Sequence, residues 1–152
     1  MSLTEKYLVG TAATLLSTEL NALANNSLAV TATAFNNLAG GGGGDGLVLC
    51  DVELVVTFGV APSINSGLSI WFLAGQDGTN YEDGADGTTT PYRAADLVLP
   101  TRATTTLQRP AKRVLLPWGT LKVLLKNDGT TQAFAATGNT LKIRPATYQG
   151  TP

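Results

Sequence analysis

The stretch LVLCDVELVVTF at residues 47–58 is the clearest secondary-structure signal in this 152-residue chain. Apolar side chains recur at every second position, and Asp51, Glu53 and Thr57 fall between them. This alternation predicts a β-strand with one face on a hydrophobic core and the other face towards water. The predicted core face comprises Val48, Cys50, Val52, Leu54, Val56 and Phe58.

Shorter segments with apolar residues at alternate positions lie on both sides of this strand. Further strands are predicted over residues 27–35, 67–74, 95–99, 107–116, 120–126 and 139–145. Turn residues separate them, and Asn127-Asp128-Gly129 has the composition of a tight hairpin turn. Because strands do not alternate with helices, the chain is predicted to be all-β, an antiparallel β-sandwich of jelly-roll-like type.

One short helix is expected near the N-terminus. Leu16, Leu20 and Leu23 recur at positions i, i+4 and i+7, and Thr14 before them is a candidate N-cap. A helix of about ten residues is marginal by itself, so its leucine face must pack on the rest of the domain.

Residues 1–12 are predicted to form an extended N-terminal arm, and residues 13–152 a single sandwich domain. The arm contains Leu3, Tyr7 and Leu8 but no periodic pattern that would fold it into the core. We expect it to be mobile in the isolated chain and to bury these three side chains on a neighbouring subunit.

Composition limits the classes of partner. Charged residues make up 14% of the chain, against about 25% in typical domains, and the net charge is −1. A weakly charged surface loses its water cheaply and favours protein association, whereas the near-zero charge gives no general attraction to nucleic acid or to an anionic membrane. No apolar run approaches the ~20 residues of a membrane span. A single cysteine and no signal-peptide pattern indicate synthesis in a reducing cytoplasm.

The charges are segregated along the chain. Residues 45–96 hold eight acidic residues and one basic residue, whereas residues 97–152 hold eight basic residues and one acidic residue. Either the two halves interleave in the fold and their charges average out, or the molecule is electrically polar and meets its neighbours charge to charge.

Catalytic chemistry is not expected. The chain contains no histidine, which removes Ser-His and Cys-His nucleophiles and the commonest metal ligand. Cys50 lies on the predicted core face, where a thiol is usually inert. The Gly-rich run at 40–46 lacks the Lys-Ser/Thr ending of a phosphate-binding loop. No cofactor or metal is predicted, although the acidic loop at 75–92 leaves calcium or carbohydrate contact open as alternatives to a solvated loop.

Four residues outside the arm are candidates for binding a partner. Trp118, in a Pro-Trp-Gly turn, either caps the core or anchors an interface. Lys122, Lys142 and Arg144 lie on basic strands of the second half and could meet an acidic neighbour.

Four stretches, in this order along the chain, are similar to a group of small virion proteins of tailed bacteriophages and prophages. They are ATLLSTELNALANNS (13–27), WFLAGQDGTNYEDG (71–84), LPWGTLKVLLKNDG (116–129) and AFAATGNTLKIRP (133–145). The resemblance covers most of the chain and lies in turn chemistry and strand order, not in an active-site motif.

What the resemblance implies is a structural protein of the virion, made in the host cytoplasm. A capsid decoration (cement) protein that binds the major capsid protein, as a homo-oligomer such as a trimer, is the leading expectation. A tail, neck or fibre component, which would contact other virion proteins, and a carbohydrate-binding module for host attachment are the alternatives.

Overall fold

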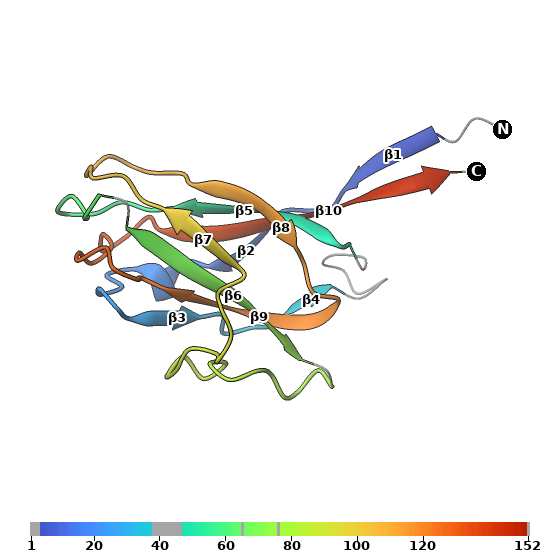
Figure 1. The fold of residues 1–152 in the computed structure, drawn as a ribbon, viewed down its shortest axis with the longest axis horizontal. Helices are drawn as coiled ribbons and strands as arrows, with labels where there is room; N and C mark the ends of the chain where they lie inside the picture. Colours follow the sequence, from blue (N-terminus) through green and yellow to red (C-terminus); the bar gives the residue numbers. More distant parts are fainter. Residues whose placement is uncertain (1–3, 38–46, 65, 76, 152) are drawn as a thin grey trace.

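The chain forms two antiparallel β-sheets that pack face to face around one main core (Figure 1). The computed structural model describes residues 4–37, 47–64, 66–75 and 77–151, with only the backbone for 4–8 and 148–151. The elements are β1 (Thr4–Val9), β2 (Ala13–Leu16), the 3₁₀ turn η1 (Thr18–Leu20), β3 (Leu28–Val30), β4 (Phe35–Asn37), β5 (Leu49–Val55), β6 (Gly67–Gly75), β7 (Leu97–Pro100), β8 (Ala111–Leu115), β9 (Gly119–Lys126) and β10 (Thr140–Thr151). The all-β, antiparallel sandwich predicted from the sequence is confirmed.

Sheet A has the strand order β1-β10-β5-β8, and β2 pairs with β10 on the same side as β1. Sheet B has the order β3-β9-β6-β7, and β4 extends the β3 side of β9. The chain passes repeatedly from one sheet to the other, as in Greek-key sandwiches.

The alternation at 47–58 is confirmed in detail. Five of the six predicted core-face residues are buried between the sheets, namely Cys50, Val52, Leu54, Val56 and Phe58. Val48, at the open end of the sandwich, is exposed instead. Phe58 meets Phe134 edge to face, with ring centroids 5.4 Å apart, and this pair closes one end of the core.

The predicted N-terminal helix is wrong. Residues 13–16 form β2, which pairs with β10, and only a single 3₁₀ turn follows at 18–20. Ala22 and Asn26 adopt positive φ values of 55° and 62°, so the backbone cannot continue as a helix. The leucine pattern did identify core residues, because Leu16, Leu20 and Leu23 are all buried.

The predicted hairpin at 127–129 is also wrong, although the turn exists. Gly129 has a φ of +74°, but β9 belongs to sheet B and β10 to sheet A, so the segment crosses between sheets. The reason is the buried Asn127 side chain, whose amide nitrogen donates hydrogen bonds to the carbonyl oxygens of Leu23, Ala24 and Gln132. Those bonds tie residues 127–132 to the loop at 21–27, so the chain does not turn back to form a strand paired with β9.

The N-terminal segment has a partner within the chain. β1 pairs with the last half of β10, from Thr4 opposite Thr151 to Val9 opposite Ala146. In Figure 1 this two-stranded ribbon extends away from the sandwich, with the start of β1 and the end of β10 side by side at its tip. The segment predicted as an extended arm is therefore a paired strand over residues 4–9.

Candidate functional site

Cys50 lacks the exposure and the low pKa that a nucleophilic thiol needs. Its side chain is fully buried between the sheets, and burial, followed by the negative charge of Asp51, raises the pKa of the thiol to about 12. A thiol in this state does not ionise near neutral pH and does not react as a nucleophile. Over the described ranges, no three Asp, Glu or Cys side chains come together in a way that could hold a metal ion. No helix in those ranges has the length and apolar character to cross a membrane.

The ribbon is the first feature that points to a partner. Residues 140–146 of β10 pair with β5, whereas residues 147–151 pair with β1 alone among the described strands. β1 in turn pairs only with β10 in that set. The ribbon therefore offers a strand edge outside the sandwich, and such an edge is a template for pairing with another chain.

An apolar row crosses the outer face of sheet A at the base of the ribbon. Val9, Ala146, Leu49 and Leu115 lie directly opposite one another in β1, β10, β5 and β8. Directly opposite residues share one face of a sheet. Leu115 is 74% exposed and Val9 is exposed as well, whereas Ala146 is buried among its neighbours. We call these four residues the apolar row.

A charged row lies next to it on the same face. Arg144, Asp51 and Arg113 are directly opposite in β10, β5 and β8. Arg113 makes a two-pronged ion pair with Asp51, with Nε–Oδ1 and Nη2–Oδ2 distances of 2.6 and 2.9 Å. This hydrogen bonding is the main reason that the pKa of Asp51 lies below its ordinary value, and the charges of Arg113 and Arg144 add to it.

One step further along, Lys142 lies opposite Glu53. Arg109 also approaches Glu53, with 3.6 Å between Nη1 and Oε1. Lys142 and Arg144, two of the residues predicted to bind a partner, are thus brought together on this face and are both exposed. With Arg109 and Arg113 they outnumber the two acidic residues of the face, so the outer face of sheet A is net positive.

The remaining predicted residues are scattered. Leu3 lies outside the described residues, and Tyr7 and Leu8 are placed only by the backbone register, opposite Tyr148 and Thr147 in the ribbon. Trp118 is 70% exposed in the turn between β8 and β9, so it does not cap the core. The Asn37 amide nitrogen holds this turn beside the apolar row by donating hydrogen bonds to Leu47 O and Pro117 O, both at 2.9 Å.

Lys122 lies on the opposite side of the molecule, on the outer face of sheet B. That face is covered by the loop at 77–96, seen in yellow-green at the bottom of Figure 1. The Lys122 ammonium sits over the Tyr81 ring, 5.3 Å from its centroid, and donates a hydrogen bond to Ala85 O. Both contacts hold the loop on the sheet.

A second apolar cluster lies beneath this loop. Trp71, Leu73 and Leu124 are buried there, and partly buried residues pack around them: Leu28, Val30, Tyr81, Ala85 and Ala95. Trp71 and Leu73 alternate with Ile70 and Phe72 along β6, so both faces of this strand are buried.

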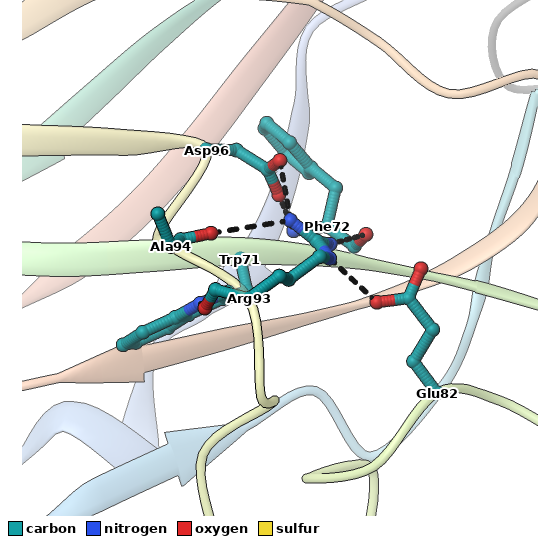
Figure 2. Close-up of polar contacts among 6 residues, drawn as sticks. All are labelled: Trp71, Phe72, Glu82, Arg93, Ala94 and Asp96. Atoms are coloured by element: carbon teal, nitrogen blue, oxygen red, sulfur yellow. Dashed lines mark hydrogen bonds and ion pairs between the residues drawn. The ribbon is translucent and has the colours of Figure 1, made fainter.

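Arg93 fastens the loop to β6 (Figure 2). Its guanidinium binds Glu82 at 2.7 Å, Asp96 at 2.6 Å and the carbonyl oxygen of Phe72 at 2.9 Å. The Trp71 indole N–H donates to Arg93 O at 3.2 Å, so the same residue is tied to β6 twice. One planar cation thus joins two separate parts of the loop to the sheet.

The acidic residues of this loop are engaged in turns. Both Asp77 carboxylate oxygens accept hydrogen bonds, one from the Thr79 and Asn80 backbone N–H groups and the other from the Asn80 side chain. These hydrogen bonds hold the pKa of Asp77 at about 2, and the bond from the Asn80 backbone N–H makes the largest contribution. Asp86 accepts from the Thr88 backbone N–H in the same way. Both side chains act as local turn acceptors.

The described surface contains hollows of moderate size. One, of about 550 Å³, is formed by the loop at 100–111 between β7 and β8, where the buried Gln108 side chain bonds to Arg102 N, Arg102 O and Thr104 O. Another, of about 580 Å³, lies on the loop over sheet B and is lined by Asp83, Thr89, Thr90 and Tyr92.

Charge separates between the two outer faces. The cover of sheet B carries five acidic residues, Asp77, Glu82, Asp83, Asp86 and Asp96, against Arg93 and Lys122, whereas the outer face of sheet A is net positive. Asp51 and Glu53 do pair with bases from the second half, as interleaving predicts. The molecule nevertheless keeps a positive face and a negative face.

Comparisons with known proteins name no family. No family model matches the sequence, and no curated protein matches it. Among solved structures, the chain is similar to "CBM35 from Cellvibrio japonicus Abf62", with 12% identity over 97% of this chain and 99% of that one, and a TM-score of 0.43. A likeness at this level says nothing about what this chain binds.

Two features of these surfaces were not predicted from the sequence. The apolar row joins residues from four strands that are far apart along the chain, so only the pairing register reveals it. The role of Arg93 was also missed, although a lone base between eight acids in residues 45–96 was the available signal.

Proposed function

We propose that this chain is a non-catalytic structural protein of a bacteriophage virion, a capsid decoration protein that attaches through the outer face of sheet A and the β1–β10 ribbon. The observation that carries the proposal is the outer face of sheet A, which none of the described segments covers, continued beyond the sandwich by a two-stranded ribbon in which β1 pairs with no described strand other than β10.

The ribbon supports attachment because two strands alone are marginally stable in water. Residues 147–151 gain no support from β5 or β2. A strand from a neighbouring subunit, added to the edge of β1 that faces away from β10, would supply the missing hydrogen bonds and fix the register.

The outer face of sheet A has the residue composition of a protein–protein interface. The apolar row supplies Leu115 and Val9 as exposed apolar contacts, and Trp118 stands exposed at the same end of the sandwich. The neighbouring basic side chains of Lys142 and Arg144 suit an acidic capsid surface, which would orient the subunit and speed its approach.

The sequence resemblance supports the location in a virion and the assembly into a homo-oligomer. The alternatives within the particle are a tail, neck or fibre position, where the chain would contact other virion proteins. Stoichiometry separates them: a decoration protein is present in numbers comparable to the major capsid protein, and a neck or fibre protein in a small fraction of that number. Absence of the chain from purified particles would overturn the proposal.

The attachment surface is tested with Leu115→Asp, which places a charge in the apolar row without touching the core. The variant should melt like the native chain, and its retention on purified particles should fall by about tenfold or more. Leu107→Asp is the matched control, because Leu107 is similarly exposed but lies on the loop between β7 and β8. Deleting residues 2–10 removes β1 and should also lower retention.

Equal retention of the native chain, Leu115→Asp and the deletion variant would show that neither the row nor the ribbon attaches the protein. Loss of retention in Leu107→Asp alone would move attachment to the hollow at 100–111.

A further inference from the structure

Tyr92 is the most exposed aromatic residue of the described chain. Its relative exposure is 101%, whereas Trp71 and Tyr81 of the same region are buried or half-buried. It stands at the hollow that Asp83, Thr89 and Thr90 also line. A fully exposed ring beside a polar hollow is not explained by packing, because it contributes nothing to the cluster beneath the loop.

The hollow is held in shape by ties on both sides. Tyr92 and Asp83 line opposite walls of the hollow, and each is next to a residue of one ion pair. Arg93 follows Tyr92 in the chain, and Glu82 precedes Asp83. The 2.7 Å ion pair between Arg93 and Glu82 (Figure 2) therefore sets the distance between the Tyr92 wall and the Asp83 wall. Its other bonds anchor Arg93 to Asp96 and to Phe72 O, so this wall is fixed to β6.

Gly84 supplies the second tie. It has a φ of +95°, and a Cβ at this position would lie 2.8 Å from Thr89 O. The backbone at Gly84 therefore passes directly against the backbone at Thr89, and only glycine allows this approach. Asp83 and Thr89 are thereby kept together on the same side of the hollow.

The lining selects one class of ligand. A phenol ring offers an apolar face for stacking, and the Asp83 carboxylate and two threonine hydroxyls offer acceptors and donors for several hydroxyl groups. A pyranose ring has this pair of surfaces, an apolar C–H face and an equatorial rim of hydroxyls. The acidic residues of the loop disfavour anionic ligands, and the hollow lacks the apolar lining that a hydrophobic molecule needs.

We infer that the hollow at Tyr92 binds a neutral saccharide, by stacking of a sugar ring on Tyr92 and hydrogen bonding of its hydroxyls to Asp83, Thr89 and Thr90. The hollow belongs to the cover of sheet B, on the side of the molecule opposite the outer face of sheet A. A subunit attached through sheet A keeps it directed away from the particle.

The test uses the purified full chain on an array of neutral oligosaccharides, with sialylated and uronic-acid oligosaccharides on the same array. The native chain should bind neutral sugars and not acidic ones. Tyr92→Ala should lower the affinity about tenfold or more, as expected when a stacking platform is lost, whereas Tyr92→Phe should retain most of it. Trp118→Ala is the matched control, because Trp118 is the other strongly exposed aromatic and lies outside the hollow.

Titration calorimetry with the best neutral sugar then compares Asp83→Asn with the native chain, and a thermal melt of each variant verifies the fold. The inference is overturned if no neutral sugar binds, if acidic sugars bind better, or if Tyr92→Ala and Trp118→Ala weaken binding equally. Because no particle is involved, these outcomes are independent of how the chain attaches to a virion.

Discussion

The outer faces of the two sheets differ in what lies over them. On sheet B, Trp71 and Leu124 are buried beneath the loop at 77–96, which Arg93 fastens. On sheet A, the equivalent surface carries Arg113 paired with Asp51 and is open to solvent. The sequence explains the difference: β6 and β9 place large apolar residues on both faces, whereas the middle of β5 places Asp51 and Glu53 on its outer face. A strand with two apolar faces needs a second cover.

The largest expected change in stability comes from truncating a side chain that is buried on the outer face of sheet B. Trp71→Ala should lower the free energy of unfolding by about 3–5 kcal/mol, because it removes a buried indole and its hydrogen bond to Arg93 O. The same truncation on the open face, Leu115→Ala, should change it by less than about 0.5 kcal/mol. Urea denaturation measures both. Similar losses for the two variants would mean that the faces do not differ in packing.

A smaller effect is expected from releasing the loop. Arg93→Ala should cost about 1–2 kcal/mol, since the charged hydrogen bonds are partly screened by solvent. Arg93→Lys should recover only part of this, because an ammonium cannot reach three acceptors in one plane. Hydrogen exchange should accelerate in residues 77–96 and not in β5. Faster exchange throughout the chain would instead indicate that Arg93 supports the whole fold.

The smallest effect is expected on the open face. A double-mutant cycle on Asp51 and Arg113 should give a coupling of about 0.2–1 kcal/mol that weakens with added salt. The pKa of Asp51 is lowered in the fold, so its contribution is present above the ordinary value of 3.8 and is lost as pH falls through the lower folded value. Cycles at pH 7 and pH 2 measure this. A coupling that persists at pH 2 would exclude an ionic origin.

The sequence predicted the sandwich where its signals are local. Alternation of apolar residues reports directly on burial. It therefore identified the core faces of β5, β6 and β9 from the segments at 47–58, 67–74 and 120–126. The N-terminal helix was wrongly predicted because its signal was not supported by pairing. A short leucine-spaced segment has little helix stability of its own, and pairing of β2 with β10 prevails over it.

The surfaces were less predictable than the fold. Lys142 and Arg144 were expected to act in binding and do share one exposed face, whereas Lys122 was grouped with them by charge and lies on the other side of the molecule. Position on a face follows from strand order, and charge along the chain does not encode strand order. The hollow at Tyr92 depends on an ion pair between residues eleven positions apart in a loop, which no periodic pattern signals.

The place of β10 in sheet A also constrains the order of events during synthesis. Every strand of sheet B precedes residue 127 in the sequence, so sheet B can form without the C-terminal segment. Sheet A cannot, because β10 is the strand between β5 and the pair formed by β1 and β2. A chain that stops before residue 140 therefore leaves β1 and β2 without a partner. Such a truncated product lacks both the ribbon and the complete outer face of sheet A.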